Sequence, residues 1–344
     1  MNSRITARLY RGTPRNLAFL ARRLRAGELV AVPTETVYGL AAHALNASAC
    51  EKIFRAKGRP THDPLIVHIH ALAQLDALAE TNDAARRLAK KFWPGPLTLV
   101  LPKKSAVPAI VTAGLPSVAI RMPRHPLMRR LLRRCELPLA APSANPFGYV
   151  SPTTAGHVRA GLGRKIRFIL DGGPTTIGLE STIVDVRDPR RPRLLRPGAI
   201  SREQIEAALG KKLFSSGKRA RPSAPLPAPG LLARHYSPRT PLILHRKISP
   251  QLAAKSGATE AWLFFAQPRG LAGPNIFWLD ARGDARRAAR KLFGLLRTLD
   301  GPSFAKATKG RPKFKKIHAE LAPGRGLAEA INDRLRRAAG RGQT

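Results

Sequence analysis

Cysteine, acidic residues and long apolar runs are scarce in this chain of 344 residues. Its two cysteines, Cys50 and Cys135, are too few for a disulfide framework or a dedicated zinc site, so we expect both to be small buried side chains in a reducing compartment. No apolar run approaches the ~20 residues that cross a bilayer, and the amino terminus has no apolar signal core. We therefore expect a cytoplasmic protein with no membrane partner.

Glycine-rich nucleotide loops are also missing. The chain contains no Gly-x-x-x-x-Gly-Lys-Ser/Thr, and no Gly-x-Gly-x-x-Gly follows an expected strand. The nine histidines show no spacing typical of zinc ligands, and the sequence predicts no metal-binding side chains. If the protein uses ATP, it must hold the nucleotide with side chains.

Positive charge is in large excess. Lysine and arginine number 61 against 21 acidic residues, a formal net charge of +40, which creates a long-range potential that attracts polyanions such as nucleotides and RNA. An arginine-rich proteome would place the same charge on an ordinary solvated surface. Charge alone therefore does not distinguish an ATP-dependent enzyme from an RNA-binding protein.

The length and a hydrophobic content of 43% favour two domains with substantial cores. In the first, over residues 10–210, Thr13 and Pro14 should start a helix that ends near Gly27, and short apolar runs then alternate with helical periodicity. The expected strands are 29–32, 65–69, 97–101, 118–120, 166–170 and 182–186, and the expected later helices are 47–57, 83–92 and 126–134. This alternation predicts a mixed α/β domain.

Residues 211–240 are rich in proline, serine and basic residues without sustained periodicity, which predicts a linker. A smaller parallel α/β domain is expected over 241–340, with strands at 242–245, 261–265 and 276–279 and helices at 285–299 and 327–338. Its lysine-dense segment 304–316 should be a loop without a packed role. We expect this domain, which offers no site motif, to steady the linker.

Polar residues gather at the ends of four expected strands, where open α/β sheets commonly bind ligands. Thr34, Glu35 and Thr36 could contact a small substrate or cap a following helix. Lys57 and Arg59 could face an anion, although cations also stabilise the end of the preceding helix.

Arg121 and the pair Ser143 and Asn145 end further strands. A guanidinium there can hold a carboxylate through two parallel hydrogen bonds, whereas each residue taken singly could be a structural cap. His68, inside an alternating run, would by default belong to the core or the surface. Several such strand ends in one domain favour a site.

These motifs, in this order, resemble the Sua5/YciO/YrdC family in its longer, two-domain Sua5 form. The resemblance covers residues from about 15 to 340. Its most specific elements are PTETVYGL at 33–40, Lys57-x-Arg59 ahead of DPLIVHI, Ser143-x-Asn145, GLESTIVD at 178–185, LLRPGAI at 194–200 and RHYSP at 234–238. It implies a twisted mixed-sheet YrdC-like domain followed by a smaller Rossmann-like parallel α/β domain.

The resemblance also assigns site residues. An L-threonine pocket would be lined by Thr34, His68, Arg121, Ala141 and Ser181, with Arg121 pairing the amino-acid carboxylate. ATP would face Lys57, Arg59, Asp63, Ser117, Ser143, Asn145, Ser151 and Arg196, with Tyr236 covering it from the linker. The catalytic centre would consist of Lys57, Arg59, Ser143 and Asn145. Family members more often have asparagine at Asp63, where an acid near phosphates is unfavourable unless it faces the metal or the ribose.

By the same resemblance, the chain would be an L-threonylcarbamoyladenylate synthase, a nucleotidyltransferase that forms threonylcarbamoyl-AMP and pyrophosphate from L-threonine, bicarbonate and ATP. A downstream transferase complex would use this product for N6-threonylcarbamoyladenosine in tRNA, and Mg²⁺ would accompany the phosphates. Lys57, Arg59, Arg121 and Arg196 would offset the charge of the gathered anions. No general base is evident, so positioning and charge stabilisation would supply most of the catalysis.

Two other functions are compatible with parts of the pattern. A non-catalytic YciO-like module would bind double-stranded RNA or tRNA by shape and phosphate contacts, with a vestigial small-molecule pocket. The presence of Lys57, Arg59, Ser143, Asn145 and the RHYSP residues disfavours it. Carbamoyl transfer, as in the related domain of hydrogenase maturation proteins, would require acylphosphatase-like and zinc-binding regions, for which the cysteines are too few.

Overall fold

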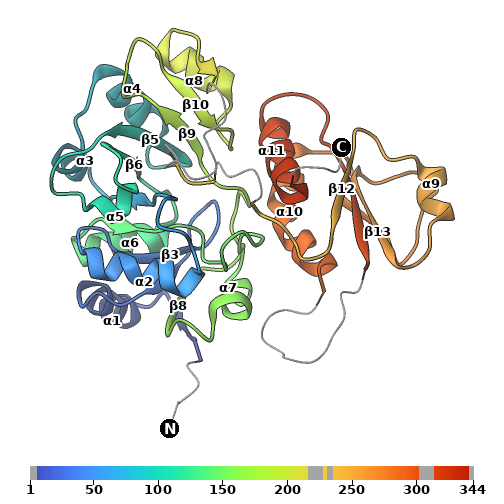
Figure 1. Cartoon of the computed structure of the whole chain (residues 1–344), viewed down its shortest axis with the longest axis horizontal. Coiled ribbons are helices and arrows are strands. Elements are labelled where there is room, and N and C mark those ends of the chain that lie inside the picture. The colour runs from blue at the N-terminus through green and yellow to red at the C-terminus, as the bar shows by residue number, and fades with distance from the viewer. Residues whose placement is uncertain (1–5, 216–227, 231–234, 302–313, 341–344) are drawn as a thin grey trace.

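The chain forms two α/β units that lie side by side in the computed structural model (Figure 1). The structure describes residues 6–215, 228–230, 235–301 and 314–340. The larger unit contains an 11-stranded mixed sheet, and the smaller unit contains a 4-stranded sheet whose strand pairs are all parallel. The predicted fold class, a mixed-sheet domain followed by a smaller parallel α/β domain, is confirmed.

Strands of the larger sheet run in the spatial order β1-β8-β2-β3-β7-β4-β6-β5-β9-β10-β11. Their bounds are β1 (Arg8–Arg11), β2 (Val30–Val32), β3 (Gly39–His43), β4 (Ile66–His68), β5 (Leu97–Pro102), β6 (Ser117–Arg121), β7 (Leu139–Ala140), β8 (Phe168–Asp171), β9 (Thr182–Asp185), β10 (Arg193–Arg196) and β11 (Phe214–Ser215). β4 and β6 pair in parallel with His68 opposite Arg121, so the polar residues at their ends are neighbours.

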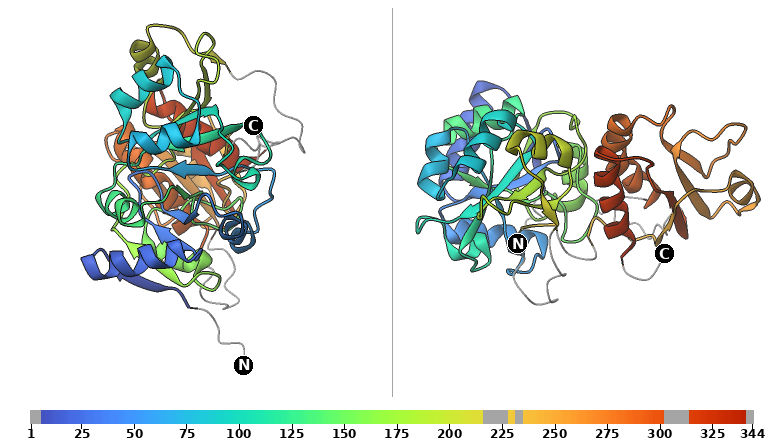
Figure 2. Two further views of the ribbon diagram at one scale, coloured as in Figure 1. Left: turned by 90° about the vertical axis from the view of Figure 1, so that its left-hand side faces the viewer. Right: turned by 90° about the horizontal axis from the view of Figure 1, so that it is seen from above.

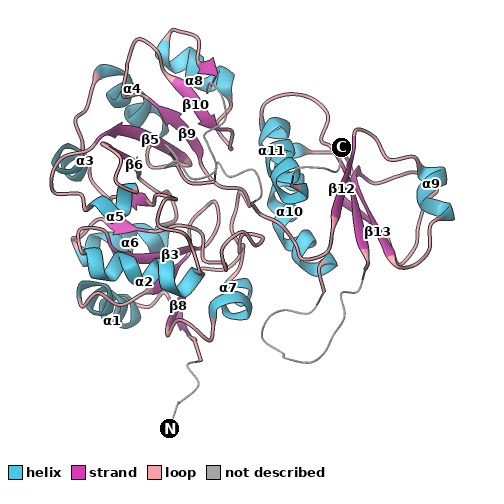
Figure 3. Ribbon diagram, viewed as in Figure 1, coloured by secondary structure: helices cyan, strands magenta, loops and turns pink. Residues whose placement is uncertain are grey.

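Helices surround this sheet (Figure 3). Their bounds are α1 (Pro14–Arg25), α2 (Ala47–Lys57), α3 (Leu72–Leu78), α4 (Asp83–Phe92), α5 (Ala109–Thr112), α6 (Pro126–Cys135), α7 (Ala155–Leu162) and α8 (Arg202–Leu209). As predicted, α1 starts after Thr13, whose hydroxyl accepts a hydrogen bond from the Asn16 amide. Cys50 and Cys135 are buried free thiols, also as predicted.

The residues after β2 lead into a strand and not into a helix. Thr34 closes a tight turn, because its hydroxyl accepts hydrogen bonds from the amides of Thr36 at 3.1 Å and Val37 at 3.2 Å. The chain then enters β3, which pairs antiparallel with β2. The alternative that Thr34 to Thr36 cap a following helix is therefore wrong. β3 is almost wholly buried, so its sequence lacks the apolar and polar alternation by which a strand is usually predicted.

The smaller sheet has the spatial order β12-β15-β13-β14. Its elements are β12 (Leu242–His245), α9 (Pro250–Lys255), β13 (Glu260–Ala266), β14 (Ile276–Asp280), α10 (Ala285–Leu299), β15 (Lys316–Glu320) and α11 (Leu327–Ala339). The three strands and two helices expected here are confirmed, and α9 and β15 are additional.

The lysine-dense segment 304–316 lies mostly outside the described residues, which resume at Phe314. Phe314 is buried in the apolar cluster of the smaller unit, and Lys316 is the first residue of β15. For these two residues the prediction of a loop without a packed role is wrong, because β15 pairs with both β12 and β13 at the centre of the sheet.

Helices α10 and α11 lie between the smaller sheet and the larger unit, whereas α9 lies on the far side of that sheet (Figures 1 and 2). Across the contact, the Tyr149 hydroxyl donates to the Asp300 carboxylate at 2.8 Å, and Arg297 donates to the carbonyls of Val150 and Ser151. The two units are therefore joined by buried and partly buried polar contacts. In the part of the chain that the structure describes, no helix is both long and apolar enough to span a membrane.

Candidate active site

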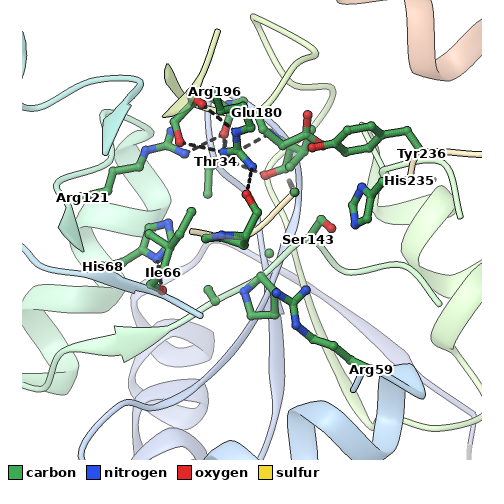
Figure 4. A pocket seen from close by; sticks show the side chains of 18 residues that line it. Thr34, Arg59, Ile66, His68, Arg121, Ser143, Glu180, Arg196, His235 and Tyr236 are labelled. Atoms are coloured by element: carbon green, nitrogen blue, oxygen red, sulfur yellow. Dashed lines mark hydrogen bonds between the residues drawn. The ribbon is translucent and has the colours of Figure 1, made fainter. Parts of the chain in front are cut away.

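A small cavity lies where the ends of several strands of the larger sheet meet residues of the linker (Figure 4). Its volume is about 50 Å³, which is room for a few water molecules and far less than a nucleotide needs. Residues from separate motifs meet around this one space, as expected for a ligand site. The predicted site residues that line it are Thr34, Arg59, His68, Arg121, Ala141, Ser143, Ser181, Arg196 and Tyr236.

Arg121, at the end of β6, is held by three acceptors. Its guanidinium donates to the Glu35 carboxylate at 2.7 Å, to the Thr36 hydroxyl at 2.9 Å and to the Gly95 carbonyl at 3.3 Å. Burial alone would raise the pKa of Glu35, but the charge and hydrogen bond of Arg121 lower it below its ordinary value, so Glu35 is ionised. Since these contacts within the described residues use three of the five N–H donors, two are left for a bound anion.

Arg59 is buried in another part of the cavity wall. It donates to the carbonyls of Asp63 at 3.0 Å and Pro64 at 2.7 Å, and its Nη2 forms an ion pair with the Asp63 carboxylate at 2.9 Å. Burial lowers the pKa of Arg59, and the charge of Asp63 opposes this shift. The Asp63 side chain does not line the cavity. The negative charge of Asp63 is therefore compensated by Arg59 outside the cavity and does not face a ligand.

Arg196, at the end of β10, connects the sheet to the linker. It donates to the Ser181 carbonyl at 3.1 Å, to the Ser181 hydroxyl at 3.2 Å and to the Pro229 carbonyl at 3.1 Å. The Ser181 hydroxyl also lies 2.7 Å from that of Thr98. Ser181 is thus fixed between two strands and the linker, and its hydroxyl is oriented before any ligand arrives.

Other predicted site residues lie behind the lining: Lys57, Asp63, Ser117, Asn145 and Ser151. Lys57, the last residue of α2, donates from Nζ to the carbonyl of Ser143 at 2.6 Å and to that of Asn145 at 2.5 Å. Burial, with the nearby charge of Arg59, lowers the pKa of Lys57 well below its ordinary value. Lys57 therefore shapes the segment that presents Ser143 to the cavity.

Asn145 and Ser151 support the same wall. The Asn145 amide donates to the carbonyls of Pro146 and Tyr149, both at 2.8 Å, and the Ser151 hydroxyl donates to the Glu180 carboxylate at 2.5 Å. The Ser117 hydroxyl is buried and has no hydrogen-bond partner among the described residues.

Sequence reasoning did not assign a role to several lining residues: Val37, Gly39, Ile66, Pro142, Glu180, Pro229, Gly230 and His235. Glu180 lies inside the GLESTIVD motif and His235 inside the RHYSP motif. These motifs were the only sequence evidence that the two residues belong to the site. The rings of His235 and Tyr236 meet edge to face with centroids 4.1 Å apart. Burial lowers the pKa of His235 well below its ordinary value, so its imidazole is neutral beside the arginines.

The imidazole of His68 should also be uncharged, and this has a measurable consequence. Burial, reinforced by the charge of Arg121, lowers the pKa of His68 from 6.5 to about 3. The unfolded chain therefore binds a proton below pH 6.5 that the folded protein does not. As a result, His68 should lower the free energy of unfolding by about 1.4 kcal/mol for each pH unit below 6.5, until about pH 3.

Urea unfolding of the wild type and of His68→Gln, from about pH 8 down to about pH 4, measures this effect. The variant should lose stability less steeply on the acid side. His62→Gln is the matched control, because His62 does not line the cavity. Equal slopes for the wild type and His68→Gln would contradict the neutral, buried state of this imidazole.

The fold and the cavity define a class of protein: two-part α/β proteins whose larger sheet, together with the linker, forms an arginine-lined cavity suited to small anionic ligands. A model of the Sua5, YciO and YrdC proteins, described as "Telomere recombination", matches residues 22–198. A second model, described as "Threonylcarbamoyl-AMP synthase, C-terminal domain", matches residues 200–340. The chain belongs to the Sua5/YciO/YrdC family, in the form that carries the Sua5 carboxy-terminal domain.

Relatives of full length resemble the chain throughout. It is 42% identical over 327 residues to the threonylcarbamoyl-AMP synthase of Pyrococcus abyssi, covering 92% of both chains. It is 41% identical over 333 residues to the Bacillus subtilis synthase of the same name, covering 94% of this chain and 93% of the relative. A crystal structure of P. abyssi Sua5 complexed with L-threonine superposes with a TM-score of 0.83 at 38% identity, covering 96% of each chain.

Proposed function

We propose that this chain is an L-threonylcarbamoyladenylate synthase, which forms threonylcarbamoyl-AMP and pyrophosphate from L-threonine, bicarbonate and ATP. The observation that carries the proposal is the convergence of Arg59, Arg121 and Arg196 on one cavity that also holds small hydroxyl side chains. Full-length relatives named threonylcarbamoyl-AMP synthase support it. Among the described residues of the lining, three guanidiniums against one carboxylate suit a reaction whose substrates are all anionic or carry a carboxylate.

L-threonine is proposed to bind at Arg121. The two N–H donors of this guanidinium that no described residue uses would hold the amino-acid carboxylate, and the neutral imidazole of His68 lies beside it in the parallel strand pair. Thr34, Ala141 and Ser181 would complete the pocket. The relative that was solved with L-threonine has the same fold, which supports an amino-acid site in this family.

ATP is proposed to face the cavity side that contains Arg59, Ser143, Arg196 and Tyr236. Lys57, Asp63, Ser117, Asn145 and Ser151 lie behind this wall, so we propose that they shape it. The cavity of about 50 Å³ is smaller than a nucleotide, so we propose that its wall rearranges when ATP binds.

Mg²⁺ is proposed to enter with the triphosphate. Among the described residues, no group of three or more His, Cys, Asp or Glu side chains could hold a metal ion. The buried carboxylates of Glu35, Asp63 and Glu180 are each paired with an arginine. Phosphate oxygens and water are therefore the ligands that we propose, and the ion would offset part of the phosphate charge.

In the proposed reaction, the threonine amine attacks the carbon of bicarbonate, and loss of water leaves a carbamate. A carbamate oxygen then attacks the α-phosphate of ATP, the bond to the bridging oxygen breaks, and pyrophosphate leaves with that electron pair. The arginines would hold the two anions at contact distance and stabilise the charge that moves onto pyrophosphate. The product would be consumed in the cytoplasm by a transferase complex that modifies adenosine in tRNA.

The proposal predicts that purified protein releases pyrophosphate from ATP only when both L-threonine and bicarbonate are present. Omission of either substrate should reduce the rate to the background without enzyme, and mass spectrometry should detect threonylcarbamoyl-AMP as the adenylated product. Pyrophosphate release that does not depend on threonine would point to a different acceptor.

RNA binding is the second candidate function, and one observation favours it. A groove of about 480 Å³ on the larger unit, away from the cavity, is lined by Lys52, Arg55, Lys165 and Arg167, with Glu28 as the single acid among its described lining residues. Four cations in one groove suit a phosphate backbone. In the same assays, absence of turnover together with salt-sensitive binding of tRNA would favour the binding module over the synthase.

A further inference from the structure

We infer that Arg334, contributed by α11 of the smaller unit, is a positioning residue for the cavity of the larger unit. It neutralises Glu180, the one carboxylate among the described residues that line the cavity, and it braces the segments that carry Ser181 and Arg196. The inference rests on the proposed function, because the ligand that it concerns is the triphosphate of ATP.

Arg334 reaches out of its own unit. The side chain has no exposed surface, and its Nε lies 2.8 Å from a carboxylate oxygen of Glu180. Its Nη1 donates to the carbonyl of Pro197 at 3.0 Å and forms an ion pair with the carboxylate of Asp333 at 2.7 Å. Glu180 directly precedes Ser181, and Pro197 directly follows Arg196. One side chain of the smaller unit therefore fixes the neighbours of two cavity residues.

The other carboxylate oxygen of Glu180 accepts the hydrogen bond of Ser151 at 2.5 Å. Both oxygens of Glu180 are thus occupied, one by a cation and one by a hydroxyl. In a site that excludes water, an unpaired carboxylate in the wall would repel phosphate groups strongly. The pairing with Arg334 removes that repulsion while the carboxylate keeps Ser151 in place.

The same arginine also contacts the linker. Its guanidinium carbon lies 5.3 Å from the centroid of the Tyr236 ring, which also stacks on Phe293 of α10 with centroids 5.5 Å apart. One turn further along α11, the Arg337 carbonyl accepts a hydrogen bond from the His235 amide at 3.0 Å. The smaller unit therefore sets both the charge of the cavity wall and the position of the linker residues beside it.

The experiment compares five proteins of full length: wild type, Arg334→Met, Glu180→Gln, the double variant, and Arg336→Met as control. Arg336 lies two residues away on the exposed face of the same helix. Each protein is titrated with ATP and with L-threonine in the pyrophosphate assay, and ATP affinity is also measured by calorimetry. Arg334→Met should raise the KM and Kd for ATP at least about 30-fold and the KM for threonine less than about threefold, because phosphate carries most of the charge.

The ATP affinity of the double variant tests whether Arg334 acts by neutralising Glu180. In the double variant, the neutral amide at position 180 needs no cation and still accepts the hydrogen bond of Ser151. ATP affinity should therefore return to within about fivefold of wild type. Additive losses in the double variant, or an unchanged ATP affinity in Arg334→Met, would overturn the inference. Absence of turnover in the wild type and in Arg336→Met would instead count against the proposed function.

Arg334→Met leaves a buried carboxylate without its cation, so this variant could fail to fold. Arg334→Lys and the double variant avoid that situation, because each keeps the net charge of the pair. If Arg334→Met is not soluble, both of these proteins should still fold and bind ATP within about fivefold of wild type. Failure of either to do so would show that Arg334 acts by packing alone, and would overturn the inference.

Discussion

Replacing Lys57 with methionine is expected to lower the turnover number by about 100-fold. The Lys57 ammonium donates to the carbonyls of Ser143 and Asn145, and methionine has a similar length but no donor. Each lost hydrogen bond to a charged donor is worth about 1.5–3 kcal/mol, and about 2.7 kcal/mol of lost positioning at the transition state corresponds to 100-fold in rate. Steady-state pyrophosphate release at saturating substrates measures the effect.

Lys52→Met is the matched control. Lys52 lies on the same helix and donates from Nζ to the Gly27 carbonyl at 2.8 Å, but it does not line the cavity. Its replacement should leave turnover within about twofold of wild type, because its bond positions no part of the site. Equal losses in both variants would show that α2 as a whole is destabilised, and full activity of Lys57→Met would show that the Ser143 segment holds its shape without the ammonium.

Much of the site could be predicted because its residues stand at the ends of strands. Thr34 and Arg121 follow or end short apolar runs, and open α/β sheets commonly bind ligands at such strand ends. His68 and Arg196 were assigned to the site only by the family resemblance. The placement of Thr34 and Arg121 depends only on local periodicity. The structure accordingly brings all four to one cavity.

The contact between Glu180 and Arg334 could not be predicted from the local sequence. They are separated by 154 positions, and the pair exists only because α11 packs against the larger unit. No periodicity or motif in the smaller domain marks Arg334, which appears as one of several arginines on an amphipathic helix. A contact between two domains depends on how they dock, and that is decided by surfaces that sequence patterns do not describe.

Two of the strands that escaped prediction, β3 and β15, did so for a common reason. β3 is buried on both faces, and β15 follows a lysine-dense stretch whose composition is typical of a loop. In both cases tertiary burial decided the structure, whereas the prediction depended on alternation or composition. Strands such as β5, whose apolar run is bounded by prolines, were predictable because the local sequence and the final environment agree.

Replacing Arg121 with methionine is expected to raise the KM for L-threonine by at least about 100-fold and the KM for ATP much less. The proposed pairing of the threonine carboxylate with two N–H donors disappears, which removes two charge-assisted hydrogen bonds of about 1.5–3 kcal/mol each. The same change leaves the Glu35 carboxylate buried without its partner at 2.7 Å, a situation that costs about 3–5 kcal/mol of stability. Threonine titration and thermal unfolding measure the two effects.

The double variant Arg121→Met with Glu35→Gln separates substrate binding from folding. Removal of both charges should restore most of the lost thermal stability, because no buried charge is then unpaired. Threonine binding should stay weak, since the amide at position 35 cannot replace a guanidinium toward a carboxylate. Arg124→Met, at an exposed arginine close by, should change neither quantity. Recovery of threonine affinity in the double variant would show that Arg121 serves only to neutralise Glu35, and that the amino acid is held elsewhere in the cavity.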